Sequence, residues 1–251
     1  MRLRKLRLGA MVGLACGLLA APAFAVTIDP INVRPVTVND PATSGTSLQA
    51  ILVDLFGANA PDVVTGQDPA GMWGSATGSP ASSVPTLEYF NGNPNDSFGI
   101  WFGSDTSNLL TVPLINAGAP VSTAAGISNM VPGSMTVFGA VCGAGGVNCG
   151  TFTNPLITPF AFGFYVNNGT DNFYTVDQLN GGTAQALAYN DGDTNWLLGF
   201  RDGVDNPPDY NNYAVKVESM RPVPEPGSMM LFGTALFGLA GAMRRRLSRG
   251  V

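Results

Sequence analysis

Residues 160–166 read Phe-Ala-Phe-Gly-Phe-Tyr-Val, and residues 213–217 read Tyr-Ala-Val-Lys-Val. Both stretches alternate in the two-residue period of a β-strand with one buried face. Six further runs rich in aromatic and β-branched residues lie between turn-forming Gly, Pro, Asn and Asp, namely 86–90, 97–102, 109–115, 135–141, 184–189 and 195–200. This punctuation predicts a mainly β fold, an antiparallel sandwich or jelly roll.

Residues 48–56 carry a different period, with apolar side chains at 48, 51, 52, 55 and 56. This is the spacing of one helix face. Thr46-Ser-Leu-Gln49 has the form of a capping box, and Gly57 follows the run as a stop. We therefore predict one short N-terminal helix opened by Thr46 and Gln49. The Gly-, Ser- and Pro-rich stretch 66–85 is expected to be an irregular loop.

The N-terminus has the three parts of a secretory signal peptide. Basic residues stand at positions 2, 4, 5 and 7, residues 8–21 are apolar, and Ala23-Phe24-Ala25 forms a cleavage site. We predict removal of residues 1–25 and export of a mature chain that starts at Val26.

The C-terminus combines three elements in a fixed order. Pro224-Glu225-Pro226 precedes an uncharged run, 227–243, and then Arg244, Arg245 and Arg246. A run of this length is at the lower limit of a membrane-spanning helix, about 17–25 residues, and the arginines would hold its end in the cytoplasm.

This arrangement resembles the PEP-CTERM sorting tail of exported Gram-negative bacterial proteins. The resemblance implies processing by an exosortase, brief residence in the inner membrane, and a final place in the cell envelope, at the outer surface or outside the cell. The chain then divides into a signal peptide (1–25), an acidic β-rich exported domain (26–221) and a sorting tail (222–251).

Charge is distributed unevenly. The chain has 12 basic and 17 acidic residues. Between positions 26 and 226 only Arg34, Arg201, Lys216 and Arg221 face all 17 acids, a net charge of −13. Nucleic acid and anionic lipid surfaces need a basic footprint, so nucleic acid is excluded as a partner. Cations and neutral polysaccharide remain.

The exported part contains two cysteines, Cys142 and Cys149, on either side of a glycine-rich loop. In an oxidising compartment this pattern predicts a disulfide between them, with a stabilisation of roughly 2–3 kcal/mol. Two thiols without histidine supply only half of a zinc site.

The chain contains no histidine, which excludes Ser-His-Asp triads, Cys-His pairs and histidine-based metal centres. What remains is carboxylate chemistry, such as glycoside hydrolysis by Glu88 or Glu218 paired with an aspartate. Nothing in the local sequence marks such a pair. We therefore expect no enzymatic activity.

Acids and amides gather around the run 196–200. Their oxygens are the ligands that Ca²⁺ prefers, so Ca²⁺ is our candidate cofactor. The candidate ligands are Asp191, Asp193, Asn195, Asp202, Asp205, Asp209 and Asn211. The alternative, left open here, is that the same residues form ordinary hairpin turns.

The stretch Trp196-Leu-Leu-Gly-Phe-Arg-Asp202, followed by Asp209-Tyr-Asn211, resembles a secreted bacterial domain of unassigned function. The pattern of that domain runs W-x-L-G-F-E-D, a short loop, then D-x-D-Y-N-D. The resemblance covers about residues 160–217. Arg201 stands where that pattern has Glu, and Asn212 where it has a last Asp. Both differences remove negative charge from the supposed cation site.

Two functions fit these observations. The first is a non-enzymatic exported protein of the cell envelope or extracellular matrix. The alternative is a carbohydrate-binding module for exopolysaccharide, in which exposed rings stack on sugars. The candidate rings are Trp73, Trp101 and Tyr210, with Tyr89 as a further one. For each ring the competing interpretation is a place in the core.

Overall fold

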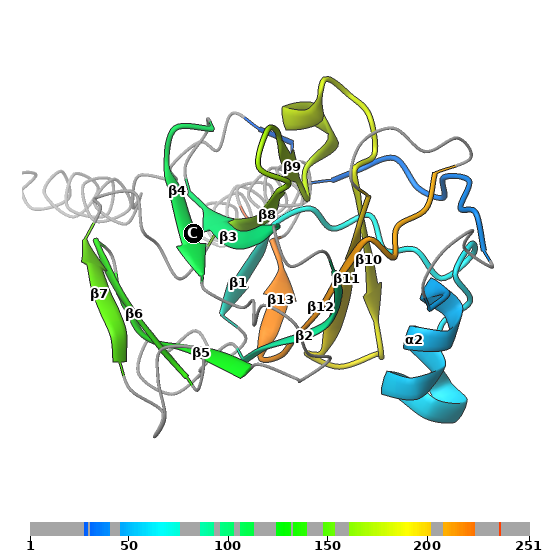
Figure 1. Cartoon of the computed structure of the whole chain (residues 1–251), viewed down its shortest axis with the longest axis horizontal. Helices are drawn as coiled ribbons and strands as arrows, with labels where there is room; N and C mark the ends of the chain where they lie inside the picture. Colours follow the sequence, from blue (N-terminus) through cyan, green and yellow to red (C-terminus); the bar gives the residue numbers. More distant parts are fainter. Residues whose placement is uncertain are drawn as a thin grey trace, which may run out of the picture.

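The chain is described from a computed structural model. The described residues are 28–29, 31–40, 46–75, 86–92, 96–102, 106–112, 124–131, 133–139, 148–153, 161–201, 208–223 and 236. Within them the fold is mainly β, with antiparallel sheets and one short α-helix (Figure 1).

Among the described residues, the helical elements are α2 (Leu48–Phe56) and two 3₁₀ turns, Gly57–Asn59 and Asp177–Asn180. The strands are β1 (Trp73–Ser75), β2 (Thr86–Gly92), β3 (Ser97–Trp101), β4 (Leu109–Val112), β5 (Ala124–Val131), β6 (Ser134–Gly139), β7 (Asn148–Thr153), β8 (Gly163–Asn167), β9 (Asn172–Tyr174), β10 (Ala186–Asn190), β11 (Trp196–Phe200), β12 (Tyr213–Val217) and β13 (Met220–Pro222). Each of the eight predicted strands has a counterpart here, with bounds shifted by a few residues.

The strands form three sheets. A long sheet has the order β10-β11-β12-β2-β5-β6-β7, a small sheet has the order β4-β3-β8-β9, and β1 pairs with β13. Figure 1 shows the long sheet running from β10 beside α2 to β7 at the opposite end, with the small sheet above it. Every strand pair is antiparallel.

Alternate side chains of the long and small sheets meet in one main core. Phe98 of β3 stacks on Phe164 of β8, with centroids 5.4 Å apart, and on Tyr213 of β12, at 6.0 Å. Leu198 and Val215 of the long sheet are in the same cluster and fully buried. Aromatic and β-branched residues at a period of two therefore predicted the correct buried face.

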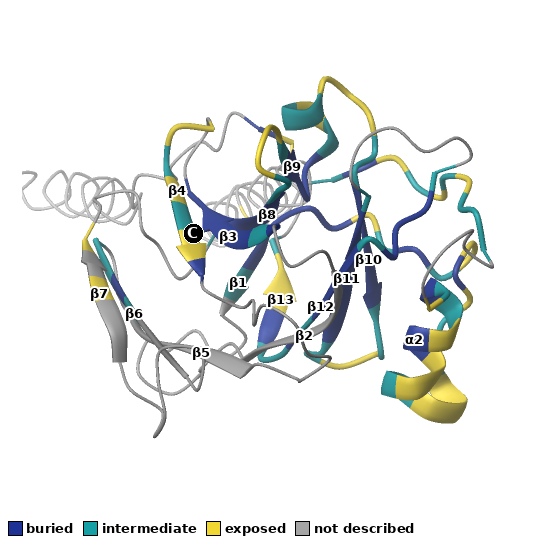
Figure 2. Cartoon of the chain, in the orientation of Figure 1, coloured by how far each residue is buried: buried dark blue, intermediate teal, exposed yellow. Residues whose placement is uncertain are grey.

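The opposite face of β10–β12 is also buried, because α2 covers it. Leu48 and Leu52 of the helix pack with Leu187 and Leu197 from the strands. Gly199 permits this approach, since a Cβ there would lie 3.1 Å from the Leu48 Cδ1. Figure 2 shows the result: β10, β11 and β12 are buried, whereas the outer side of α2 is exposed.

The start of α2 differs from the predicted capping box. Ser47, not Thr46, is the N-cap, and its hydroxyl accepts a hydrogen bond from the Ala50 N–H at 3.1 Å. Gln49 instead ties the helix to the following loop by accepting from the Val63 N–H and donating to the Pro61 carbonyl. The Gln49 side chain therefore bonds the loop at residues 61–63 instead of the backbone at the start of its own helix.

The segment before α2 is fixed to the β domain by buried polar contacts. The Arg34 guanidinium binds the Asp177 carboxylate with two nitrogens, at 2.6 and 3.0 Å, and donates to the Ala186 carbonyl at 2.8 Å. Asn32 donates to the Thr175 carbonyl and accepts from the Asp177 N–H. Residues 31–40 are therefore part of the folded domain.

Candidate functional site at the end of the β domain

The last described strand, β13, closes the domain by pairing with β1. Trp73 lies opposite Pro222, Gly74 opposite Arg221, and the Val223 N–H donates to the Met72 carbonyl at 3.0 Å. β1 lies within the stretch 66–85 that the sequence predicted to be irregular. That prediction was wrong for residues 73–75, because their strand pairs with segments far away in the chain.

Pro222 occupies the position in β13 where a proline costs nothing. Antiparallel ladders alternate between hydrogen-bonded and non-hydrogen-bonded pairs. The Val223–Met72 bond makes that pair a hydrogen-bonded one, so Trp73 and Pro222 form the next, non-bonded pair. The missing N–H of Pro222 therefore removes no ladder bond. Trp73 uses its own N–H and carbonyl on the other side, toward Phe162, at 2.8 and 2.9 Å.

Met220 anchors the start of β13 in the main core. Its side chain is fully buried, its N–H donates to the Thr194 carbonyl, and its carbonyl accepts from the Trp196 indole N–H, both at 3.2 Å. Arg221 and Pro222 are exposed. The strand is thus held firmly at residue 220 and only lightly at residues 222–223.

Both ends of the exported domain reach one apolar cluster. We call it the end cluster: Ile28, Met72, Trp101, Tyr165, Tyr174 and Val176, with Ala161, Leu179 and Val223 packed against it. Ile28 follows the predicted signal-peptide cleavage site by three residues, and Val223 directly precedes Pro224. The two points at which targeting segments join the domain are therefore close together.

Glycines let the aromatic rings of the end cluster lie flat on the small sheet. Trp101 pairs with Gly163, and Tyr165 with Gly99. A Cβ on Gly163 would lie 2.2 Å from the Trp101 Nε1, and one on Gly99 would lie 2.3 Å from the Tyr165 Cε1. Each ring covers the bare backbone of its cross-strand glycine.

The predicted targeting segments fall largely outside the described residues. This applies to the signal peptide 1–25, to Pro224, Glu225 and Pro226, and to Arg244, Arg245 and Arg246. Of the predicted span 227–243 only Leu236 is described. No helix within the described ranges is long and apolar enough to cross a membrane.

The first half of the predicted calcium cluster is a self-contained hairpin turn between β10 and β11. The Asp191 carboxylate accepts from the Asp193 N–H at 3.0 Å and from the Asn195 amide at 2.8 Å. Asn190 accepts from the N–H of Gly192, whose φ of 95° favours glycine. These side chains hold the turn's backbone, as the hairpin alternative requires.

The second half lies at the other end of β11. Asp209 and Asn211 are buried; Asp209 accepts from the Asn211 N–H, and the Asn211 amide donates to the Thr46 carbonyl at 2.7 Å. Asp202 and Asp205 fall outside the described residues.

Strand geometry keeps the two halves apart. Residue 196 pairs with residue 190 at one end of β11, and residue 200 pairs with residue 213 at the other. Five strand residues separate the ends by about 14 Å, whereas Ca²⁺ ligands lie about 2.3–2.6 Å from the ion. One site built from all seven predicted ligands is therefore wrong. In the described part of the chain, no three Asp, Glu or Cys residues are grouped to hold a metal.

The residues of the W-x-L-G-F … D-Y-N pattern have structural contacts. The Trp196 indole binds the Met220 carbonyl, and the Tyr210 hydroxyl donates to the Ala184 carbonyl at 3.2 Å. Burial raises the pKa of Tyr210, and a hydrogen bond with Arg201 opposes that rise. Arg201 therefore contacts a buried phenol, a partner that its position in the sequence did not reveal.

The rings predicted as sugar-stacking candidates are in the interior. Trp73 and Trp101 are 0% exposed and Tyr210 is 1% exposed. Trp73 lies between Phe164 and Trp196, with both centroids 5.6 Å away. The sugar-stacking interpretation of these three rings is wrong, and the competing one, a place in the core, is correct, because each ring fills space between strands or below a covering segment. The side chain of Tyr89 is not described.

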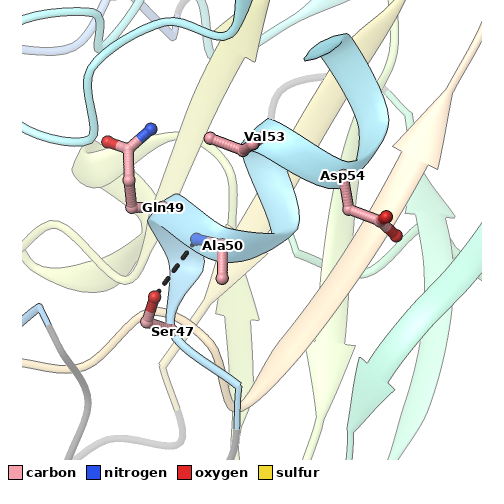
Figure 3. A pocket seen from close by; sticks show the side chains of 5 residues that line it. All are labelled: Ser47, Gln49, Ala50, Val53 and Asp54. Carbon is pink, nitrogen blue, oxygen red and sulfur yellow. Dashed lines mark hydrogen bonds between the residues drawn. The ribbon is translucent and has the colours of Figure 1, made fainter.

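Cys149 lies in β7, while Cys142 falls outside the described residues, so the predicted disulfide stays a prediction. A shallow pocket over the start of α2 is lined by Ser47, Gln49, Ala50, Val53 and Asp54 (Figure 3). With Ser47 engaged in capping, Asp54 is its single charged group. One carboxylate is too few for a catalytic acid pair or for a metal site.

No curated protein and no solved structure matches this chain significantly. Residues 222–246 match the PEP-CTERM protein-sorting motif, and this match begins at Pro222, the last residue of β13. The C-terminus is therefore a PEP-CTERM sorting motif joined directly to the folded β domain, which marks the chain as an exported protein that an exosortase sorts to the cell surface.

Proposed function

We propose that this chain is a non-enzymatic protein of the cell envelope or extracellular matrix, whose β domain is the cargo delivered by the sorting motif. The observation that carries the proposal is the direct junction between the two. The motif starts at a residue of β13, so processing delivers the whole domain, from residue 28 to residue 223, as one unit.

Three acids, two of them candidates for an enzyme or a cation site, make structural contacts instead. Glu218, one of the two candidate catalytic glutamates, pairs with Lys216 at 2.5 Å on the surface. Asp177 binds Arg34, and Asp191 holds a turn. These contacts support a structural domain. The carbohydrate-binding alternative loses its main candidates with the burial of Trp73, Trp101 and Tyr210.

Deletion of residues 224–251 tests the sorting role. We expect the truncated chain to be exported but to miss its final location, and fractionation of cells and medium measures this. Replacement of Pro224 and Pro226 by alanine is the matched variant, because it keeps the apolar run and the arginines. An unchanged location and an unchanged size for both variants would contradict the proposal.

A further inference from the structure

We propose that Pro222 and Val223 must leave the β1–β13 pairing before the exosortase takes up the sorting motif, so that this pairing sets the rate of processing. The inference rests on the proposed sorting function and names a step within it. The partner is a membrane enzyme that binds this segment as a peptide.

The sorting motif and the paired strand overlap in sequence. The motif spans residues 222–246, whereas the domain's backbone pairing extends to Val223. Pro222 and Val223 therefore belong both to the motif and to the paired strand. The Val223 N–H donates to the Met72 carbonyl, and a donor engaged there is not available to an enzyme that binds the same backbone. Peptides bound in extended form depend largely on such main-chain hydrogen bonds.

Pro222 and Val223 are bound only weakly to β1, and the part of β13 that can open is short. Pro222 contributes no N–H and is exposed, so the Val223–Met72 bond fastens this end. One net hydrogen bond corresponds to about a fivefold change in an equilibrium constant. Opening beyond these two residues meets the Gly74–Arg221 pair and then Met220, whose side chain is buried in the main core and whose N–H and carbonyl have partners outside β1. The two residues can thus separate while the domain stays folded.

The place of the pairing suits a membrane enzyme. Met72 and Val223 lie in or against the end cluster, which also holds Ile28, close to the predicted signal-peptide junction. Both chain ends leave the domain at this face, so this face is the one next to the bilayer while either targeting segment is still attached.

A reversible lock tests the step directly. Met72 and Val223 lie opposite each other, and both belong to the end cluster. The Cα atoms of such a hydrogen-bonded pair are about 5.5 Å apart, within the range of a disulfide. In the full chain, oxidised Met72→Cys/Val223→Cys should be shortened at least fivefold more slowly than either single variant in a pulse-chase measurement. Reductant should restore the rate.

An insertion provides the opposite test. Gly-Ser-Gly-Ser-Pro-Val placed after Val223 leaves β13 paired and supplies a second, free Pro-Val before Pro224. We expect processing about fivefold faster than in a control chain with the same six residues inserted at the exposed Gly181–Gly182 turn.

The outcomes separate the two proposals. Equal rates for the locked chain and its single-cysteine variants, or for the insertion and its control, would overturn this inference. If the unmodified chain is never shortened in cells that contain an exosortase, the proposed function itself fails.

Discussion

The buried ion pair between Arg34 and Asp177 gives the sharpest test of how the N-terminal segment is held. The Arg34 side chain is 3% exposed and that of Asp177 is 16% exposed. Arg34 donates two hydrogen bonds to the carboxylate and one each to the Ala186 and Val33 carbonyls. Replacement by methionine keeps roughly the length of the side chain but removes all four hydrogen bonds.

The expected cost follows from what stays behind. Arg34→Met leaves the Asp177 carboxylate largely buried without its cation, and removing one partner of a buried pair costs about 3–5 kcal/mol. For a domain of this size, with a urea m value of about 2 kcal/mol/M, the midpoint should fall by about 1.5–2.5 M. The double variant Arg34→Met/Asp177→Leu should lose less free energy of unfolding than the two single variants lose in sum.

Arg221→Met is the matched control. Arg221 is an exposed arginine in β13, and such surface changes alter stability by about 0.5 kcal/mol or less. Urea unfolding of residues 26–226, followed by tryptophan fluorescence, measures all four variants. If Arg34→Met unfolds at the midpoint of Arg221→Met, the pair does not hold the segment, and our account of residues 31–40 is wrong.

Three further outcomes follow from the structure. Burial raises the pKa of Tyr189, so above pH ~10 the unfolded state loses this proton first. Stability should therefore fall as the pH rises past 10, and Tyr189→Phe should flatten the fall in a pH series of melting temperatures, although it loses the bond to the Val63 carbonyl. Gly163→Ala should destabilise more than Gly192→Ala in urea unfolding, because its Cβ meets the Trp101 ring at 2.2 Å; equal losses would contradict the close packing. Asp191→Ala should lower the melting temperature equally with Ca²⁺ and with chelator, because its carboxylate binds the turn; a loss confined to Ca²⁺ would revive a cation site there.

The sequence predicted the strands that carry strong local patterns. Residues 196–200 and 213–217 pack side chains on both faces of the long sheet, and their apolar runs identified them. Strands β1, β9 and β13 have three residues each, too few to show a period. They form because distant segments offer partners, as Phe162 and Pro222 do for Trp73. Local pattern contains no information about such partners.

The site was predicted less completely, for a similar reason. A row of acids and amides along the chain suggested one cation site, yet β11 carries its two halves to opposite ends. Exposed aromatic rings could not be distinguished from buried ones, because Trp73 sits in a glycine-rich stretch and its cover comes from Phe164 and Trp196. In contrast, the sorting motif was identified from sequence alone, since its three elements are contiguous.

The position of β13 links folding to export. With the predicted signal peptide leading the chain across the membrane, residues 220–223 would emerge after every other part of the domain. Met220 fills the main core and accepts the Trp196 indole N–H, so the core is complete only when this last strand has arrived. The sorting motif begins two residues later. In that order of emergence, an exosortase would meet the motif once the final strand has docked, and it would then compete with β1 for Pro222 and Val223.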